Sequence, residues 1–155
     1  MLQSPSVFYK ILKRTITAGD YIDWSYNVLE DGFSSPSLAI LSSCSSTDNI
    51  FEIESYFRRA AEELEIEHPT FETAARARMA FLAMKIMETK DDDYRQIYHL
   101  TDRIFKVAAV ELNYPDDLIP WIHLSKLMDK VDYNYDKGVI SEMKNKAGQL
   151  LKTVN

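Results

Sequence analysis

Apolar residues recur at intervals of three and four along most of the chain. The most regular run lies in residues 49–67, where the spacing i, i+3, i+4, i+7 continues for several helical turns. The opposite face of the same run carries Glu and Arg side chains. An amphipathic helix of this kind must bury its apolar stripe against other helices. The pattern therefore predicts a helix over residues 49–67 that is packed inside a helical protein. Its apolar positions are Ile50, Ile53, Phe57, Ala60, Ala61 and Leu64.

The segment before this run carries the start and stop signals of three shorter helices. Ser4 and Pro5 predict the start of the first helix, and Gly19 its end. Asp20 then predicts the N-cap of a second helix, which Gly32 terminates in the left-handed conformation. Ser35, followed by a proline, starts a third helix only a few residues later. We expect the second and third helices to form an antiparallel hairpin, with Trp24 in the core.

The segment after residue 67 continues in the same way. His68 and Pro69 predict the end of the long helix, and Thr70 the start of the next. Further apolar stripes follow residues 90–93, the Asp116–Asp117 pair and the loop 132–138. We find no convincing strand and no repeat of fixed period. The sequence predicts an all-α fold: a single domain over residues 1–155, built as a compact bundle of seven or eight helices with short antiparallel helical hairpins.

Composition narrows the class of partner. The chain has 155 residues, is 46% apolar and carries a net charge of −6. An acidic protein does not suit nucleic acid, because affinity for a phosphate backbone depends on Lys and Arg. No run is long and apolar enough for a membrane span. We therefore expect a cytoplasmic protein with a protein partner, for which a basic surface is the natural complement, and neither nucleic acid nor membrane.

Candidate catalytic and metal-binding residues are sparse. Glu65 and His68 match the Glu-x-x-His element of helical di-iron proteins, but those proteins need the element twice and no second copy exists. Cys44 is the only cysteine and has neither a cationic neighbour nor a helix N-terminus beside it to lower its pKa. The four glycines form no phosphate-binding loop. We expect no metal, no cofactor and no enzymatic activity.

Aromatic and acidic residues lie close together in the last third of the sequence. Tyr and Trp are enriched at the energetic centres of protein interfaces, and neighbouring carboxylates would suit a basic partner. The alternative is that Trp121 belongs to the core and the tyrosines cover it. A second acidic segment begins at Glu62. The candidate partner-binding residues are Asp116, Asp117, Trp121, Asp132, Tyr133, Tyr135, Glu62 and Glu63.

One stretch, residues 19–57, carries a resemblance. It is similar to small uncharacterised bacterial all-helical proteins of comparable length, and it covers about a quarter of the chain. The resemblance implies a helical fold in a bacterial cytosol and brings no known activity, although it favours a role like that of toxin-neutralising immunity proteins. The matching positions are Trp24, Leu29, Gly32, Ser35, Leu38, Leu41, Asn49, Phe51, Glu52, Tyr56 and Phe57.

Two functions are compatible with these features. The first is a protein–protein interaction module, of an immunity, antitoxin or adaptor type, that neutralises a basic partner through an acidic surface. The second is a small-molecule-sensing or regulatory protein with an apolar pocket between its helices. The lining of that pocket is expected to include Met79, Met84, Tyr98 and Phe105.

Overall fold

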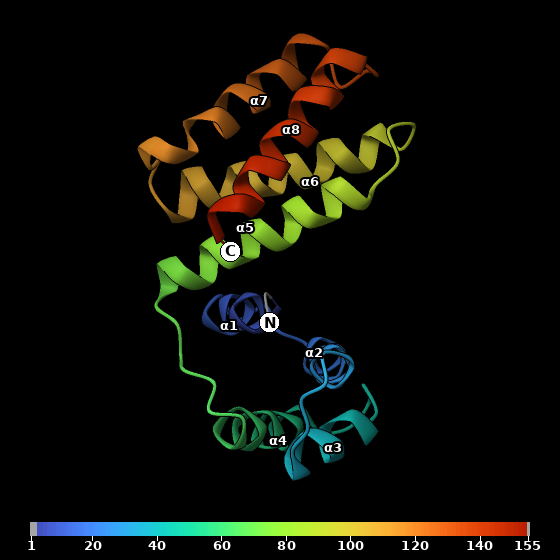
Figure 1. Cartoon of the computed structure of the whole chain (residues 1–155), viewed down its shortest axis with the longest axis vertical. Coiled ribbons are helices and arrows are strands. Elements are labelled where there is room, and N and C mark those ends of the chain that lie inside the picture. Colours follow the sequence, from blue (N-terminus) through green and yellow to red (C-terminus); the bar gives the residue numbers. More distant parts are fainter. Residues whose placement is uncertain (1–2, 155) are drawn as a thin grey trace. The chain divides into compact units, whose positions relative to one another are not determined.

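The computed structural model describes residues 3–154 and confirms the all-α prediction, since these residues form eight α-helices and no strand (Figure 1). A π-helical turn, Val107–Glu111, and a short 3-10 turn, Asp116–Leu118, separate the sixth helix from the seventh. The α-helices are α1 (Gln3–Leu12), α2 (Ala18–Glu30), α3 (Pro36–Ser43), α4 (Ile50–Glu63), α5 (Phe71–Glu88), α6 (Tyr94–Lys106), α7 (Ile119–Lys130) and α8 (Lys137–Val154).

The helices group into two compact units. Unit 1 comprises the residues up to Ala74, and unit 2 the residues from Ala75 onward. The grouping does not test whether the units fold together, so a single domain over residues 1–155 stays a prediction.

The core of unit 1 is an aromatic cluster between α2 and α4. The Phe57 ring lies 4.7 Å from that of Trp24 and 4.9 Å from that of Tyr21, measured between centroids. Leu38 of α3 packs into the same cluster. Trp24 is buried and donates a hydrogen bond from Nε1 to Ser4 Oγ at 2.8 Å. The prediction that Trp24 belongs to the core is therefore confirmed.

The start of α2 differs from the sequence prediction. Thr17, not Asp20, is the N-cap, because Thr17 Oγ1 accepts from the Asp20 backbone N–H while the Asp20 carboxylate accepts from the Thr17 backbone N–H. This reciprocal capping box places Gly19 inside the first turn of α2, so Gly19 does not end the preceding helix. That helix, α1, ends at Leu12, and Arg14 adopts a φ of 55° just beyond it.

The end of α4 also differs from the prediction. The helix stops at Glu63 rather than beside Pro69, and Glu65 takes the left-handed conformation with a φ of 53°. The predicted starts of α3 and α4, and the predicted role of Gly32, are confirmed. Asn49 caps α4, Ser35 caps α3 through a hydrogen bond from the Leu38 N–H, and Gly32 has the predicted positive φ, 90°.

Unit 2 is built from α5, from Ala75 onward, and α6 to α8. Figure 1 shows these four helices running in alternating directions along the chain, as in an up-and-down bundle. Lys144, in the middle of α8, joins that helix to the segment that follows α5, because its Nζ lies 2.6 Å from both the Thr89 carbonyl oxygen and Asp91 Oδ1. The fully buried residues of the core include Met79, Ile86, Ile97, Ile104, Met128, Met143 and Ala147.

Candidate functional site

Four tyrosines come together at one end of unit 2. Tyr94 and Tyr98 lie one turn apart on α6, with ring centroids 5.7 Å apart. Tyr135 stacks edge-on against Tyr94 at 5.7 Å, and Tyr133 lies edge-on to Tyr98 at 6.5 Å. We call these four residues the tyrosine cluster. Edge-to-face geometry is the arrangement that aromatic quadrupoles favour, so the rings hold one another in position.

Hydrogen bonds fix the chain between α7 and α8 beneath the cluster. Tyr98 is only 3% exposed, and its Oη donates to the Asn134 carbonyl oxygen at 2.7 Å. Tyr133 Oη donates to Asp129 Oδ1 at 3.0 Å. Asp132 and Tyr133 adopt φ values of 53° and 55°, which turn the chain sharply after α7. Tyr133 and Tyr135 thereby remain 52% exposed each, on an ordered support.

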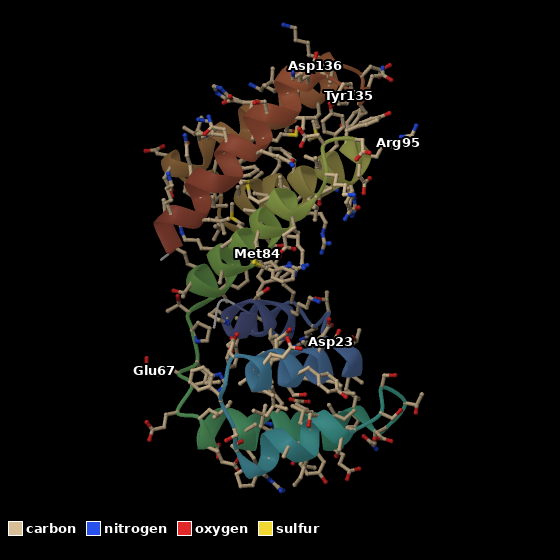
Figure 2. The ribbon with its side chains drawn as sticks, turned by 45° about the vertical axis from the view of Figure 1, so that its right-hand side comes forward. Asp23, Glu67, Met84, Arg95, Tyr135 and Asp136 are labelled. Atoms are coloured by element: carbon tan, nitrogen blue, oxygen red, sulfur yellow. The ribbon has the colours of Figure 1, made fainter. Side chains whose placement is uncertain are left out.

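Carboxylates surround the exposed rings. Asp129 lies in the last turn of α7, and Asp132 lies two residues beyond its end. At the start of α8, Asp136 Oδ1 accepts from the Val139 backbone N–H at 3.0 Å. Figure 2 shows Asp136, Tyr135 and Arg95 at the same end of unit 2. The Arg95 guanidinium lies 5.8 Å from the Tyr94 ring centroid. Basic groups alternate with these carboxylates, because Lys130 and Lys137 are exposed beside them in the sequence.

The hydroxyls of Tyr98 and Tyr133 stay protonated at neutral pH. The hydrogen bond to Asp129, together with that residue's negative charge, raises the pKa of Tyr133 above its ordinary value. Burial is the main cause that raises the pKa of Tyr98. Both hydroxyls therefore act as hydrogen-bond donors within the structure, and the exposed faces of the rings are what a partner would meet.

The structure places the other predicted residues elsewhere. Trp121 is 3% exposed and belongs to the core of unit 2, as the alternative prediction has it, so no partner can reach it in this structure. Asp116 and Asp117 lie at the opposite end of α7 from Asp132, roughly 20 Å away at 1.5 Å per residue. The predicted acidic patch is therefore not one continuous surface.

Asp117 already has a partner within the chain. Its carboxylate accepts two hydrogen bonds from the Arg76 guanidinium, at 2.7 and 3.2 Å. These hydrogen bonds are the main reason that the pKa of Asp117 is lowered. The ion pair between Arg76 and Asp117 joins α5 to the turn before α7. Asp116, the neighbouring residue, is exposed.

Glu62 and Glu63 belong to unit 1 and have different surroundings. Glu62 is exposed. The Glu63 carboxylate accepts from the Ser37 backbone N–H at 3.0 Å and from Ser37 Oγ at 2.7 Å, which joins the end of α4 to the start of α3. Its pKa is lowered mainly by the hydrogen bond from the Ser37 side chain. Glu63 therefore has a structural role whether or not it meets a partner.

Sequence reasoning missed half of the tyrosine cluster. It placed Tyr98 in an expected pocket with Met79, Met84 and Phe105, and it gave Tyr94 no role in binding. Met79 and Tyr98 are buried, while Met84 and Phe105 are half-buried. A signal was present, because two tyrosines four residues apart lie on the same face of a helix. What the sequence could not show is that the loop around Tyr133 folds back onto that face.

The residues considered for metal or thiol chemistry have other surroundings. His68 is exposed, and its ring lies edge-on to Phe8 at 4.8 Å between centroids. Within residues 3–154, no three His, Cys, Asp or Glu side chains gather in a group able to hold a metal ion. Burial, then Asp48 and Glu52, raise the pKa of the Cys44 thiol, which keeps it in the less nucleophilic protonated form.

Comparison with protein-family models, with curated proteins and with solved structures finds no match to this chain. The described helices include none with the length and apolar character needed to cross a membrane.

Proposed function

We propose that this protein is a protein-binding module and that the tyrosine cluster is its contact surface. The observation that supports this most directly is a pair of half-exposed tyrosines, Tyr133 and Tyr135, held by ring contacts and hydrogen bonds on the end of a helical bundle. Tyrosine has few rotatable bonds, so a preorganised ring offers a large contact area at a small cost in side-chain entropy.

The charges around the cluster indicate the kind of partner. Asp129, Asp132 and Asp136 favour a surface that carries Lys or Arg, and an Arg guanidinium can also stack on an exposed tyrosine ring. Complementary charge of this kind accelerates encounter more than it strengthens the final complex. In the sharpest version of the proposal, the partner is a basic effector, and the module acts as an immunity-type or adaptor protein that covers the effector's functional surface.

Replacement of Tyr135 should weaken the complex. Tyr135→Ala removes a half-exposed ring at a position with ordinary backbone geometry, and we expect the dissociation constant to rise about tenfold, as for a moderate interface hot spot. A photoreactive amino acid at position 135 would first identify the partner by cross-linking in the native cell. Isothermal titration calorimetry with that purified partner then gives the dissociation constants of the wild type and the variant.

Tyr26→Ala is the matched control. Tyr26 is 51% exposed and lies on α2 in unit 1, so its loss changes exposed aromatic area to the same extent at a distant place in the sequence. We expect its affinity to equal that of the wild type. Equal affinities for Tyr135→Ala and wild type, or cross-links at position 26 to the same partner but none at position 135, would contradict the proposed surface.

A further inference from the structure

A groove of about 570 Å³ lies along unit 2 between α7 and α8. On α7 its lining extends from Ile119 to Leu127, a length of roughly 12 Å at 1.5 Å per residue. Pro120 and Lys146 also line a smaller hollow of about 160 Å³, so the two spaces adjoin. A volume of this size is typical of small-molecule sites. No residue of the tyrosine cluster lines either space, so the proposed function does not use them.

The floor of the groove is aliphatic. Leu124 is 2% exposed, and Pro120 and Leu127 are half-buried beside it on α7. Spacings of three and four residues place these three side chains on one face of the helix. Ile119 lies at the end of this row and is 40% exposed. Because the row contains no aromatic ring for edge-to-face contact, it suits an alkyl chain better than an aryl group.

The walls of the groove carry more basic than acidic side chains. His123 and Lys126 of α7 are exposed, and neither has a hydrogen bond or an ion pair within residues 3–154. Lys146 adds a third basic group from α8. Among the described residues that line the groove, Glu142 alone carries a carboxylate. The charges therefore favour an anionic ligand over a cationic one.

Lys146 is less closely paired than the other half-buried lysines. The side chains of Lys10 and Lys144 are 27% and 24% exposed, and each Nζ lies 2.6 Å from an aspartate oxygen. The Lys146 side chain is also 27% exposed, but its Nζ lies 3.8 Å from Glu142 Oε1 and 3.4 Å from Gln149 Oε1. A hydrogen bond between an ammonium and a carboxylate is normally about 2.7–2.9 Å long. A partly desolvated cation without a close carboxylate favours a ligand that supplies one.

We propose that this groove binds a medium-chain fatty acid, with its carboxylate at Lys146 Nζ and its alkyl chain along Leu124 and Leu127. The carboxylate supplies the close partner that Lys146 lacks, and the alkyl chain covers the aliphatic floor. This inference does not rest on the proposed protein-binding function, because the groove and the tyrosine cluster share no residue. It assigns a small-molecule ligand class to α7 and α8.

The test uses the full chain and three probes: octanoate, 1-octanol and butyrate. Two-dimensional NMR of the wild type should show octanoate-dependent shifts within residues 119–127 and 142–150. 1-Octanol lacks the charge and should bind about tenfold more weakly, as expected for the loss of one charge-assisted hydrogen bond. Butyrate keeps the charge but has a shorter chain, so it should bind more weakly by about tenfold or more.

Lys146→Met tests the proposed contact with the carboxylate. Methionine keeps an unbranched side chain and removes the charge, so octanoate affinity should fall about tenfold while 1-octanol affinity does not fall. Lys152→Met is the matched control, because Lys152 is exposed on the same helix and lines neither space. It should leave both affinities unchanged. Circular dichroism should show that both variants keep the helical content of the wild type.

The three probes test the proposal in the wild type without any variant. It is overturned if octanoate binds no more tightly than 1-octanol or butyrate, or if octanoate shifts only residues outside the groove. It is also overturned if a folded Lys146→Met variant keeps the octanoate affinity of the wild type. An acidic amphipathic peptide that binds the same residues more tightly than octanoate would overturn it in favour of a protein partner.

Discussion

Glu63 shows how one surface side chain can serve the fold. It is exposed and acidic, which made it a candidate for partner binding. Its carboxylate nevertheless accepts hydrogen bonds from both the backbone N–H and the hydroxyl of Ser37. The start of a helix leaves N–H groups without an intrahelical acceptor, and the partial positive charge there favours a carboxylate. Glu63 supplies this acceptor to α3 from the far end of α4. The sequence shows the acidic residue but not the distant N–H group it satisfies.

Glu63 should make the stability of the protein depend on pH in the acid range. Its pKa is lower in the folded than in the unfolded chain, so its contribution is complete above the unfolded value of ~4.3 and is lost as the pH falls through the folded value. We expect Glu63→Gln to lower the free energy of unfolding at pH 6, and the difference from wild type to shrink by pH 3. Urea titrations at pH 6, 4.5 and 3 would measure it.

Glu62→Gln controls for the loss of one exposed carboxylate in the same turn. If Glu62→Gln lowers the free energy of unfolding as much as Glu63→Gln does at each pH, the hydrogen bonds between Glu63 and Ser37 contribute nothing specific to stability.

At the scale of the helices, the starts of α3 and α4 could be predicted, whereas the start of α2 and several helix ends could not. Ser35 and Asn49 cap α3 and α4 through their own side chains, so the signal lies within a few residues of the helix it starts. The ends of α1, α4 and α7 instead use left-handed residues that are not glycine: Arg14, Glu65 and Asp132. Such residues carry no local sign of this conformation, and the prediction placed the end of α4 several residues too late. Gly32, at the end of α2, gave a stop signal that could be recognised.

The left-handed conformation at Glu65 and Gly32 leads to opposite predictions for substitutions to and from glycine. A non-glycine residue in the left-handed conformation destabilises the folded chain by roughly 1–2 kcal/mol. Replacement by glycine removes this strain, but the greater freedom of glycine in the unfolded chain cancels part of the gain in stability. We expect Glu65→Gly to raise the free energy of unfolding by about 0.5–1 kcal/mol. Gly32→Ala should lower it by ~1 kcal/mol or more, and only through backbone strain, because no atom lies within 4 Å of the added Cβ.

Chemical denaturation of both variants would measure these changes. Gly19→Ala is the control, since Gly19 lies inside α2 with room for a methyl group and without a positive φ. It should be neutral or stabilising. A destabilised Glu65→Gly variant would contradict the account of the α4 terminus.

For the whole molecule, charge is distributed unevenly. Residues 1–74 carry 12 acidic and 5 basic side chains, whereas residues 75–155 carry 12 and 13. The net negative charge therefore comes from the unit that lacks the tyrosine cluster. Around Tyr133 the charges are nearly balanced, because Asp129, Asp132 and Asp136 are interleaved with Lys130 and Lys137. Tyr133, Tyr135 and Asp132 were predictable as neighbours in sequence, whereas Tyr94 and Tyr98 join them only through the fold.

Local charge, rather than total charge, should control partner association. Asp129→Asn, Asp132→Asn and Asp136→Asn together remove three negative charges at the cluster, and Asn keeps both the cap acceptor at position 136 and tolerance of the left-handed backbone at position 132. Because charges are screened within ~8 Å at physiological salt, we expect the association rate constant to fall about tenfold and its dependence on salt to weaken.

The matched triple variant removes the same charge from unit 1: Asp23→Asn, Asp31→Asn and Glu62→Gln, all at exposed positions. Its association rate should stay within about twofold of the wild type if the charge around the cluster, rather than the charge of unit 1, steers the encounter. Stopped-flow mixing with the partner at several salt concentrations would measure both variants. If the unit 1 variant slows association as much as the cluster variant, overall charge rather than the cluster steers the encounter.

The two tryptophans of the chain have a practical consequence. Trp24 is sealed in the core of unit 1 and Trp121 in that of unit 2, and no other indole is present. The fluorescence of each therefore reports on the unit that encloses it, because an indole emits at longer wavelength once water reaches it. With one tryptophan replaced by phenylalanine at a time, the loss of each core can be followed separately, without any attached dye.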